Sequence, residues 1–310
     1  MEFLKLLEAV RTPALDAFFS GITYFGDELA FMALALLIFW CVDKRMGYYC
    51  FTVGLFGTLG NQFLKILCRI PRPWVLDPNF TIVESARAAA TGYSFPSGHT
   101  QNAVGTFGAI GLMAKRRWVK FLCLALVLLV PFSRMYLGVH TPLDVGVAFL
   151  MAAILLAALS PVFRSEGRTK KAMPVFLAAG VALAFLFVFY VSSIRADFAP
   201  GSADESNLAH AVKNAWTLLG AIAGLFCVFF FDSRGRNFDP HAPLFGQSLK
   251  FSLGLLLIVG IKAGLKPLLH ALLPSGPADA VRYFLIVVFA GLVWPRTFPR
   301  FAKLGRKKEA

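Results

Sequence analysis

The sequence predicts an all-α protein whose helices cross a membrane many times. Hydrophobic residues make up 57% of the 310 residues and charged residues 15%, and the mean hydropathy is +0.67. A typical soluble domain has about a quarter of its residues charged. The apolar residues also gather in long runs that short polar segments separate, as they do in polytopic membrane proteins.

Ten apolar runs approach the length of about 20 residues that a membrane span needs. They cover residues 13–27, 28–42, 47–67, 98–114, 118–135, 142–163, 174–194, 209–231, 248–266 and 279–294. The first two runs are short and carry Asp16, Asp27 and Glu28. We therefore expect ten spans, or nine if residues 2–25 lie in the membrane interface.

The basic residues predict the orientation of these spans. The formal net charge is +14, but the Lys and Arg residues lie in short runs between apolar segments, which does not suit a nucleic-acid partner. The runs fall on one side of the span order, at 44–45, 115–117, 164–171, 234–236 and 296–308. The positive-inside rule makes this side cytoplasmic. The opposite loops, at 68–97, 136–141, 195–208 and 267–278, are then non-cytoplasmic.

The basic segment 164–171 predicts a division of the chain. The six spans before it carry all the strong polar clusters, and the roughly four spans after it carry none. We expect a six-helix core over residues 1–163 and accessory transmembrane helices, without an assigned role, over residues 174–310. The connector 195–207 mixes acidic residues with Pro and Gly, which predicts a solvated loop.

Three polar clusters interrupt the first half of the sequence. They are Lys65-x6-Arg72-Pro73, then Tyr93-Ser94-Phe95-Pro96-Ser97-Gly98-His99, and finally Ser133-Arg134-x5-His140-x3-Asp144. A phosphate monoester carries nearly two negative charges, and cations or N–H donors aimed at its oxygens stabilise its transition state. Each cation alone could be an anchor that reaches the lipid headgroups. Together with two histidines, the cations predict a phosphoryl-transfer site.

The residue types assign roles within this site. Lys65, Arg72 and Arg134 supply cations, and the two arginines can each bind two oxygens. Ser97 and Gly98 stand where a helix begins, so its free N–H groups can face an anion.

The third cluster and His99 supply the acid–base groups. His140 and Asp144 are four residues apart, which places them on one face of a helix. Asp144 can hold one ring nitrogen of His140 while the other acts as a nucleophile, and His99 can protonate the leaving oxygen.

The three clusters resemble the signature motifs of the type 2 phosphatidic acid phosphatase family, which shares its site with the vanadium haloperoxidases. The resemblance covers roughly residues 12–163 and keeps the order and internal spacing of the motifs. It implies a six-helix core with a non-cytoplasmic site, a phosphohistidine at His140, and no metal or other cofactor. The residues that it implies for phosphoryl binding are Lys65, Arg72, Ser97, Gly98 and Arg134.

The remaining polar and small residues have weaker assignments. Trp74, Lys262, Lys266 and Arg282 could contact the lipid substrate, although anchoring at the membrane interface is the more ordinary role for them. Gly254, Gly260 and Gly264, and the pair Gly220 and Gly224, predict close helix packing. That packing could join the core to the accessory helices or form a homodimer.

The leading functional hypothesis is an integral-membrane lipid phosphatase in the plasma (inner) membrane, acting on a phosphomonoester or diphosphate. The candidate substrates are phosphatidic acid, phosphatidylglycerophosphate, undecaprenyl diphosphate and a sphingoid-base phosphate. One alternative is a phosphotransferase that uses a lipid or glycan acceptor. Another is a lipid transporter or scramblase with a regulatory phosphatase core, against which stands the absence of paired broken helices in two halves.

Overall fold

The computed structural model describes residues 1–194, 201–235 and 238–304. Within these residues the regular secondary structure is helical, and no strand occurs. The predicted fold class is confirmed. The chain forms two compact units that each draw on separate stretches of sequence. The first contains Met1–Met32, Tyr49–Pro161 and Ser193–Ala211, and the second contains Ala33–Tyr48, Val162–Ser192 and Val212–Ala310.

Every predicted apolar run lies on a helix. Over the described residues, six helices are long and apolar enough to cross a membrane, or seven if a bent pair counts as one span. The pair is Pro13–Gly26 and Glu28–Cys41, which meet at 53°. Two further helices, α4 (Lys44–Cys68) and α6 (Gly98–Met113), do not meet this test. Helix α6 has only 16 residues, and α4 carries polar side chains along its length.

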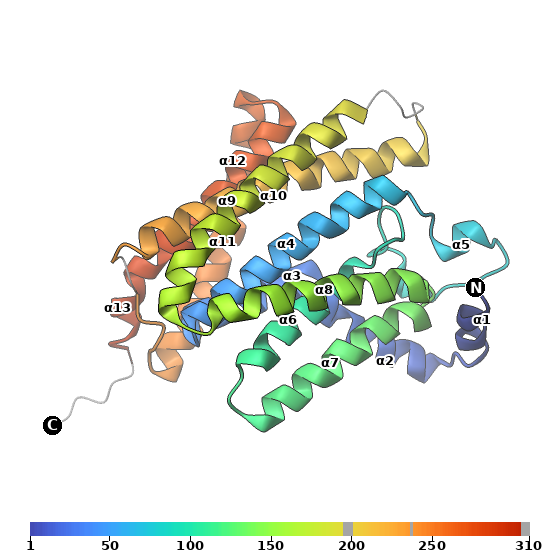
Figure 1. Ribbon diagram of the computed structural model, residues 1–310, viewed down its shortest axis with the longest axis horizontal. Helices are drawn as coiled ribbons and strands as arrows, with labels where there is room; N and C mark the ends of the chain where they lie inside the picture. Colours follow the sequence, from blue (N-terminus) through green and yellow to red (C-terminus); the bar gives the residue numbers. More distant parts are fainter. Residues whose placement is uncertain (195–200, 236–237, 305–310) are drawn as a thin grey trace. The chain divides into compact units, whose positions relative to one another are not determined.

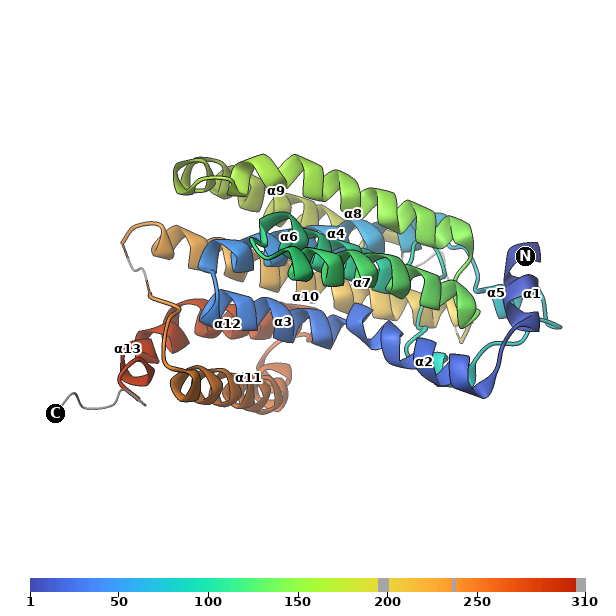
Figure 2. The same ribbon diagram turned by 90° about the horizontal axis from the view of Figure 1, so that it is seen from below.

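The first unit contains the helices that carry the polar clusters, together with neighbouring helices. They are α1 (Glu2–Ala9), α2 (Pro13–Thr23), η1 (Tyr24–Gly26), most of α4, α5 (Pro73–Leu76), η2 (Glu84–Ala86), α6, α7 (Arg117–Tyr136), most of α8 (Pro142–Phe163) and the first residues of α10 (Ala203–Asp232). Helices α6 and α7 pack side by side (Figures 1 and 2). The Tyr49 hydroxyl of α4 donates to the Leu156 carbonyl of α8 over 2.8 Å. These contacts bring the ends of the helices that carry the clusters to one region.

A small apolar core supports the long loop between α4 and α6. Its buried members come from α1, α2, this loop and the end of α7, and include Leu4, Phe19, Phe80 and Leu137. The Arg11 guanidinium bridges two of these segments, because its Nε donates to the Tyr136 carbonyl and its Nη1 to the Thr81 carbonyl. The loop is therefore held both by apolar packing and by hydrogen bonds from Arg11.

The second unit contains most of α3 (Glu28–Cys41), α9 (Glu166–Ser193), the rest of α10, α11 (Leu244–Leu272) and α12 (Ser275–Val288). It ends in η4 (Phe289–Val293), η5 (Trp294–Thr297) and α13 (Phe298–Phe301). A Cβ at Gly220 would lie 2.0 Å from the Ala280 carbonyl oxygen, and one at Gly224 2.9 Å from Val287 Cβ. The predicted close packing therefore holds between α10 and α12. A Cβ at Gly260 or Gly264 would meet no atom within 4 Å, and a homodimer through these residues stays a prediction.

Candidate active site

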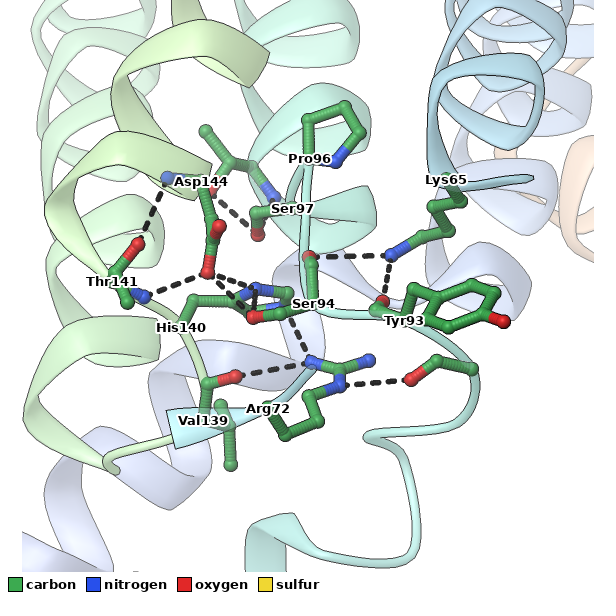
Figure 3. A network of polar contacts seen from close by, with 12 residues as sticks. Lys65, Arg72, Tyr93, Ser94, Pro96, Ser97, Val139, His140, Thr141 and Asp144 are labelled. Carbon is green, nitrogen blue, oxygen red and sulfur yellow. Dashed lines mark hydrogen bonds and ion pairs between the residues drawn. The ribbon is translucent and has the colours of Figure 1, made fainter. Parts of the chain in front are cut away.

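The beginning of α8 fixes the position of Asp144. Pro142 is the first helical residue, and Thr141 and Asp144 bond to each other reciprocally. The Thr141 N–H donates to Asp144 Oδ2 over 2.8 Å, and the Asp144 N–H donates to Thr141 Oγ1 over 3.2 Å. This arrangement has the geometry of a capping box. It holds the carboxylate against His140, whose Nδ1 lies 3.4 Å from Asp144 Oδ2 (Figure 3).

The other ring nitrogen of His140 faces a cation. Arg72 Nη1 lies 3.0 Å from His140 Nε2. Because a guanidinium can only donate, Nε2 must accept and so carries a lone pair. The ring proton then belongs on Nδ1, toward Asp144. The contacts thus favour the tautomer that the sequence analysis expects, with an unprotonated Nε2 directed at Arg72 (Figure 3).

The surroundings of His140 keep its ring neutral. The side chain is 2% exposed, and its pKa lies well below the ordinary value of 6.5. Burial is the largest cause, and the positive charges of Arg72, Arg134, Lys65 and His99 act in the same direction. A neutral imidazole is the nucleophilic form. The structure also brings together residues from all three clusters around one ring.

Arg72 and Lys65 are held by backbone carbonyls of one short loop segment, residues 91–94. Arg72 donates from Nη2 to Thr91 over 2.7 Å and from Nε to Gly92 over 3.1 Å. Lys65 Nζ donates to the carbonyls of Tyr93 and Ser94 over 2.6 and 3.4 Å. We call this segment the carbonyl loop. It fixes the direction of two cations that the sequence assigns to phosphoryl binding.

Arg72 remains a cation at neutral pH. Its side chain is buried, and burial lowers its pKa to about 10, while the charge of Asp144 acts in the opposite direction. Its Nη1 also donates to the Val139 carbonyl over 3.0 Å. The guanidinium is therefore clamped from three backbone positions beside His140.

Arg134 lies on the last turn of α7 and is fully buried. Its Nη1 donates to Thr23 Oγ1 over 2.7 Å, and its carbonyl accepts from the N–H groups of Val139 and His140. Its Nε and Nη2 have no hydrogen-bond partner within the described part of the chain. A buried guanidinium with free donors is costly, so this edge suits an anion such as a phosphoryl group.

The beginning of α6 brings in the second cluster. Ser97 is the N-cap, and its Oγ accepts from the Thr100 N–H. The Ser97 N–H donates to the Asp144 carbonyl over 3.0 Å, which ties α6 to α8. His99 follows on the first turn and is partly exposed. The turn at Gly26 packs against the beginning of α6, because a Cβ at Gly26 would lie 2.8 Å from the His99 carbonyl oxygen.

Sequence reasoning gave no role to Ser94, which the structure places in the centre of the site. Its fully buried hydroxyl donates to Asp144 Oδ2 over 2.5 Å and lies 3.4 Å from His140 Nδ1. Thr23 and Thr141 were also missed. Ser94 belongs to the second motif, so its position in the sequence was the available signal, but its partner could not be read from spacing.

The residues predicted to contact lipid lie in different settings. Trp74 is partly buried, with the guanidinium carbons of Arg72 and Arg87 at 5.9 and 5.3 Å from its ring. In the second unit, Lys262 and Lys266 are exposed on α11. Arg282 is buried on α12, where its Nη2 donates to Asp279 over 2.6 Å. Contact of any of the four with lipid stays a prediction.

The end of the connector predicted over residues 195–207 is helical. Residues 195–200 lie outside the described part of the chain. Residues from Ala203 onward begin α10, and Asp204 accepts a hydrogen bond from Tyr93 in the carbonyl loop. This end of the connector therefore contacts the site.

Two family matches cover most of the sequence. Residues 45–168 match the PAP2 superfamily, and residues 216–307 match the PAP2 superfamily phosphatase, transmembrane extension. The first match contains all three polar clusters. The second assigns the later helices to an extension found with such domains. No solved structure matches the chain.

Curated relatives carry the names of lipid phosphatases. The chain is 24% identical to lipid phosphate phosphatase delta of Arabidopsis thaliana over 86% of this chain and 66% of that protein. It is 29% identical to a probable sphingosine-1-phosphate phosphatase of Dictyostelium discoideum, over 48% of this chain and 38% of that protein. It is 26% identical to an undecaprenyl-diphosphatase of Sulfolobus acidocaldarius, over 55% of this chain and 81% of that protein. The matched region thus spans between 38% and 81% of the length of these three relatives.

Proposed function

Because the chain belongs to the PAP2 superfamily, we propose that it is an integral-membrane phosphatase that hydrolyses the phosphomonoester or diphosphate of a lipid. The observation that carries this proposal is the pair of contacts on His140. Its Nε2 lies 3.0 Å from the Arg72 guanidinium, and its Nδ1 lies 3.4 Å from the Asp144 carboxylate. One side of the ring is thus oriented by an anion, and the other is directed toward a group that binds phosphoryl oxygens.

In the proposed reaction, His140 Nε2 attacks phosphorus and the bond to the leaving oxygen breaks. The Nδ1 proton interacts with Asp144, which stabilises the positive charge that the ring gains. His99 gives a proton to the leaving alcohol or phosphate. A water molecule then attacks the phosphohistidine, His99 takes a proton from this water, and phosphate leaves with His140 restored.

The cations stabilise the charge on the phosphoryl oxygens during both steps. Arg72 and Lys65 are already oriented by the carbonyl loop, and the buried Nε and Nη2 of Arg134 have no other partner among the described residues. The N–H groups at the beginning of α6, near Ser97 and Gly98, add further donors. Such preorganised donors are often the largest contribution to catalysis of this kind. The mechanism needs no metal, so a chelator is expected to leave the rate unchanged.

The site opens on the non-cytoplasmic side in this proposal, because the three clusters lie in or next to loops opposite the basic runs. Residues 1–163 form the catalytic core, and residues 174–310 form an accessory transmembrane part. The relatives' names agree on a phosphate attached to a lipid but differ in the lipid. Phosphatidic acid, phosphatidylglycerophosphate, undecaprenyl diphosphate and a sphingoid-base phosphate therefore remain the candidates.

The test is phosphate release from these four lipids by purified protein in detergent micelles. The matched variants are His140→Ala and His241→Ala, the second changing an exposed histidine that pairs with Asp239. We expect wild type and His241→Ala to release phosphate from at least one lipid and His140→Ala to release none. Equal release by His140→Ala and wild type would refute the role of His140. Release that requires an added acceptor lipid would point to phosphotransfer instead.

A further inference from the structure

A residue from the second half of the chain contacts the loop that orients the phosphoryl-binding cations. The Tyr93 hydroxyl donates to Asp204 Oδ1 over 2.6 Å. Asp204 lies on the exposed first turn of α10, whereas Tyr93 is 5% exposed. Both residues belong to the first compact unit. The contact joins positions 111 residues apart in sequence.

Tyr93 stands in the middle of the carbonyl loop. The carbonyls of the two residues before it accept from Arg72, and its own carbonyl and that of Ser94 accept from Lys65. The Ser94 hydroxyl in turn bonds Asp144. Movement of Tyr93 would therefore change the direction of both cations and of the carboxylate that orients His140.

The Tyr93 side chain is largely buried and is held from α10 by the hydrogen bond to Asp204. Burial and, after it, the hydrogen bond to Asp204 raise the pKa of Tyr93 to about 12. The hydroxyl therefore keeps its proton throughout the neutral pH range and remains a donor to Asp204.

We propose that Asp204 is a positioning residue for phosphoryl binding, acting through Tyr93 on the carbonyl loop and thereby on Lys65 and Arg72. The inference rests on the proposed function and extends it, because it gives the beginning of α10 a part in the site. Asp204 touches neither the phosphoryl group nor His140. Its effect is to keep the cations preorganised, which matters because a donor that must first be oriented stabilises the transition state less.

The variants separate the hydrogen bond from the charge. Tyr93→Phe and Asp204→Ala each remove the bond, whereas Asp204→Asn keeps an oxygen that can accept it. Glu205→Gln is the matched control. It removes a charge one residue away on the same turn, from a carboxylate that accepts from the Gly201 N–H and not from Tyr93.

The readouts are kcat/KM for lipid phosphate hydrolysis and the inhibition constant for vanadate, a phosphate mimic. A hydrogen bond to a charged partner supports an expected loss of about tenfold in kcat/KM for Tyr93→Phe and Asp204→Ala, with a similar rise in the vanadate constant. The double variant is expected to lose no more than either single one, because both remove the same bond. Asp204→Asn should stay within about threefold of wild type, as expected for a retained bond, and Glu205→Gln should match wild type.

A lower melting temperature with unchanged vanadate inhibition in both single variants would overturn the proposal, as would losses that multiply in the double variant. A failure of the proposed function can be told apart from a failure of the inference on Asp204. If wild type hydrolyses no lipid phosphate, the vanadate-induced rise in melting temperature replaces inhibition as the readout. A smaller rise in Tyr93→Phe and Asp204→Ala than in Glu205→Gln would still support the role of Asp204, and equal rises or no rise in wild type would overturn it.

Discussion

Replacement of Arg72 by lysine separates geometry from charge at the candidate site. The arginine makes four contacts, to the carbonyls of Thr91, Gly92 and Val139 and to His140 Nε2, at 2.7–3.1 Å. Lysine keeps the positive charge but has one nitrogen at the end of a flexible stem. That nitrogen cannot reach the carbonyl loop and His140 with the same fixed fork.

The expected loss follows from the contacts that lysine cannot replace. A hydrogen bond from a charged group contributes about 1.5–3 kcal/mol, and a lysine at this position forfeits at least two. The transition state would then lose about 3–6 kcal/mol of stabilisation, which corresponds to a fall of about 10²–10⁴ in kcat/KM at about 1.4 kcal/mol for each factor of ten. Removal of one oxyanion donor in other enzymes has an effect of about the same size.

The assay is phosphate release by purified Arg72→Lys in micelles, with the lipid that wild type hydrolyses. Arg168→Lys is the matched control, because Arg168 is exposed on α9. Equal elution on size exclusion and an unchanged melting temperature would show that Arg72→Lys is folded. A folded Arg72→Lys protein with kcat/KM within about threefold of wild type, where the hydrogen bonds predict far more, would refute the reasoning. Charge alone would then account for the role of Arg72.

Three further outcomes concern pH, the serine of the second motif and the second unit. Because the pKa of His140 is lowered, the ring is neutral at pH 6.5 and protonation removes its lone pair only at lower pH. Arg72→Gln removes a charge that opposes protonation, so the acid limb of its kcat/KM profile moves to higher pH than that of wild type on the same lipid. Ser94→Ala removes the hydroxyl that holds Asp144 and lowers kcat about tenfold, with partial recovery in Ser94→Thr. Asp232→Ala, which breaks a partly buried ion pair with Lys44 and a tyrosine hydrogen bond, lowers the free energy of unfolding in a detergent titration by about 1.5–3 kcal/mol.

Each of these expectations has a contrary result. Superimposable acid limbs for wild type and Arg72→Gln would mean that the limb reports the ionisation of the lipid and not of His140. A Ser94→Ala protein with wild-type kcat would make its bond to Asp144 irrelevant to turnover. An unchanged unfolding titration for Asp232→Ala would mean that water replaces its two partners without cost.

The helices were predictable because each span needs a long apolar run and little else. Two helices that do not meet the length and hydropathy test for a span, α4 and α6, are informative. Helix α6 begins at the second motif and has only 16 residues, and α4 carries Asn61 and Lys65 close to the site. The 53° bend between Pro13–Gly26 and Glu28–Cys41 was not predictable, because two short runs in sequence do not report the angle between them.

The site was predictable where one helix turn or one motif sets the geometry. Four-residue spacing placed Asp144 beside His140, and a Ser-Gly pair marked the beginning of α6. The contacts of Ser94 with Asp144 and of Asp204 with Tyr93 join one loop to the first turns of two helices that are distant in sequence. No periodicity links such positions, so only the folded loop 68–97 reveals them.

In the proposed mechanism, His140 Nε2 becomes bonded to phosphorus during turnover. The most direct measurement is rapid alkaline quenching of the purified protein during hydrolysis of a lipid phosphate, followed by mass spectrometry of the peptide that contains His140, because phosphohistidine survives base better than acid. The proposed mechanism predicts a phosphate adduct on His140 in wild type and none in His140→Ala. In His99→Ala both the formation and the hydrolysis of the adduct are slowed, so the adduct appears and decays more slowly than in wild type. An adduct on another residue, or full turnover with no adduct in either wild type or His99→Ala, would contradict it.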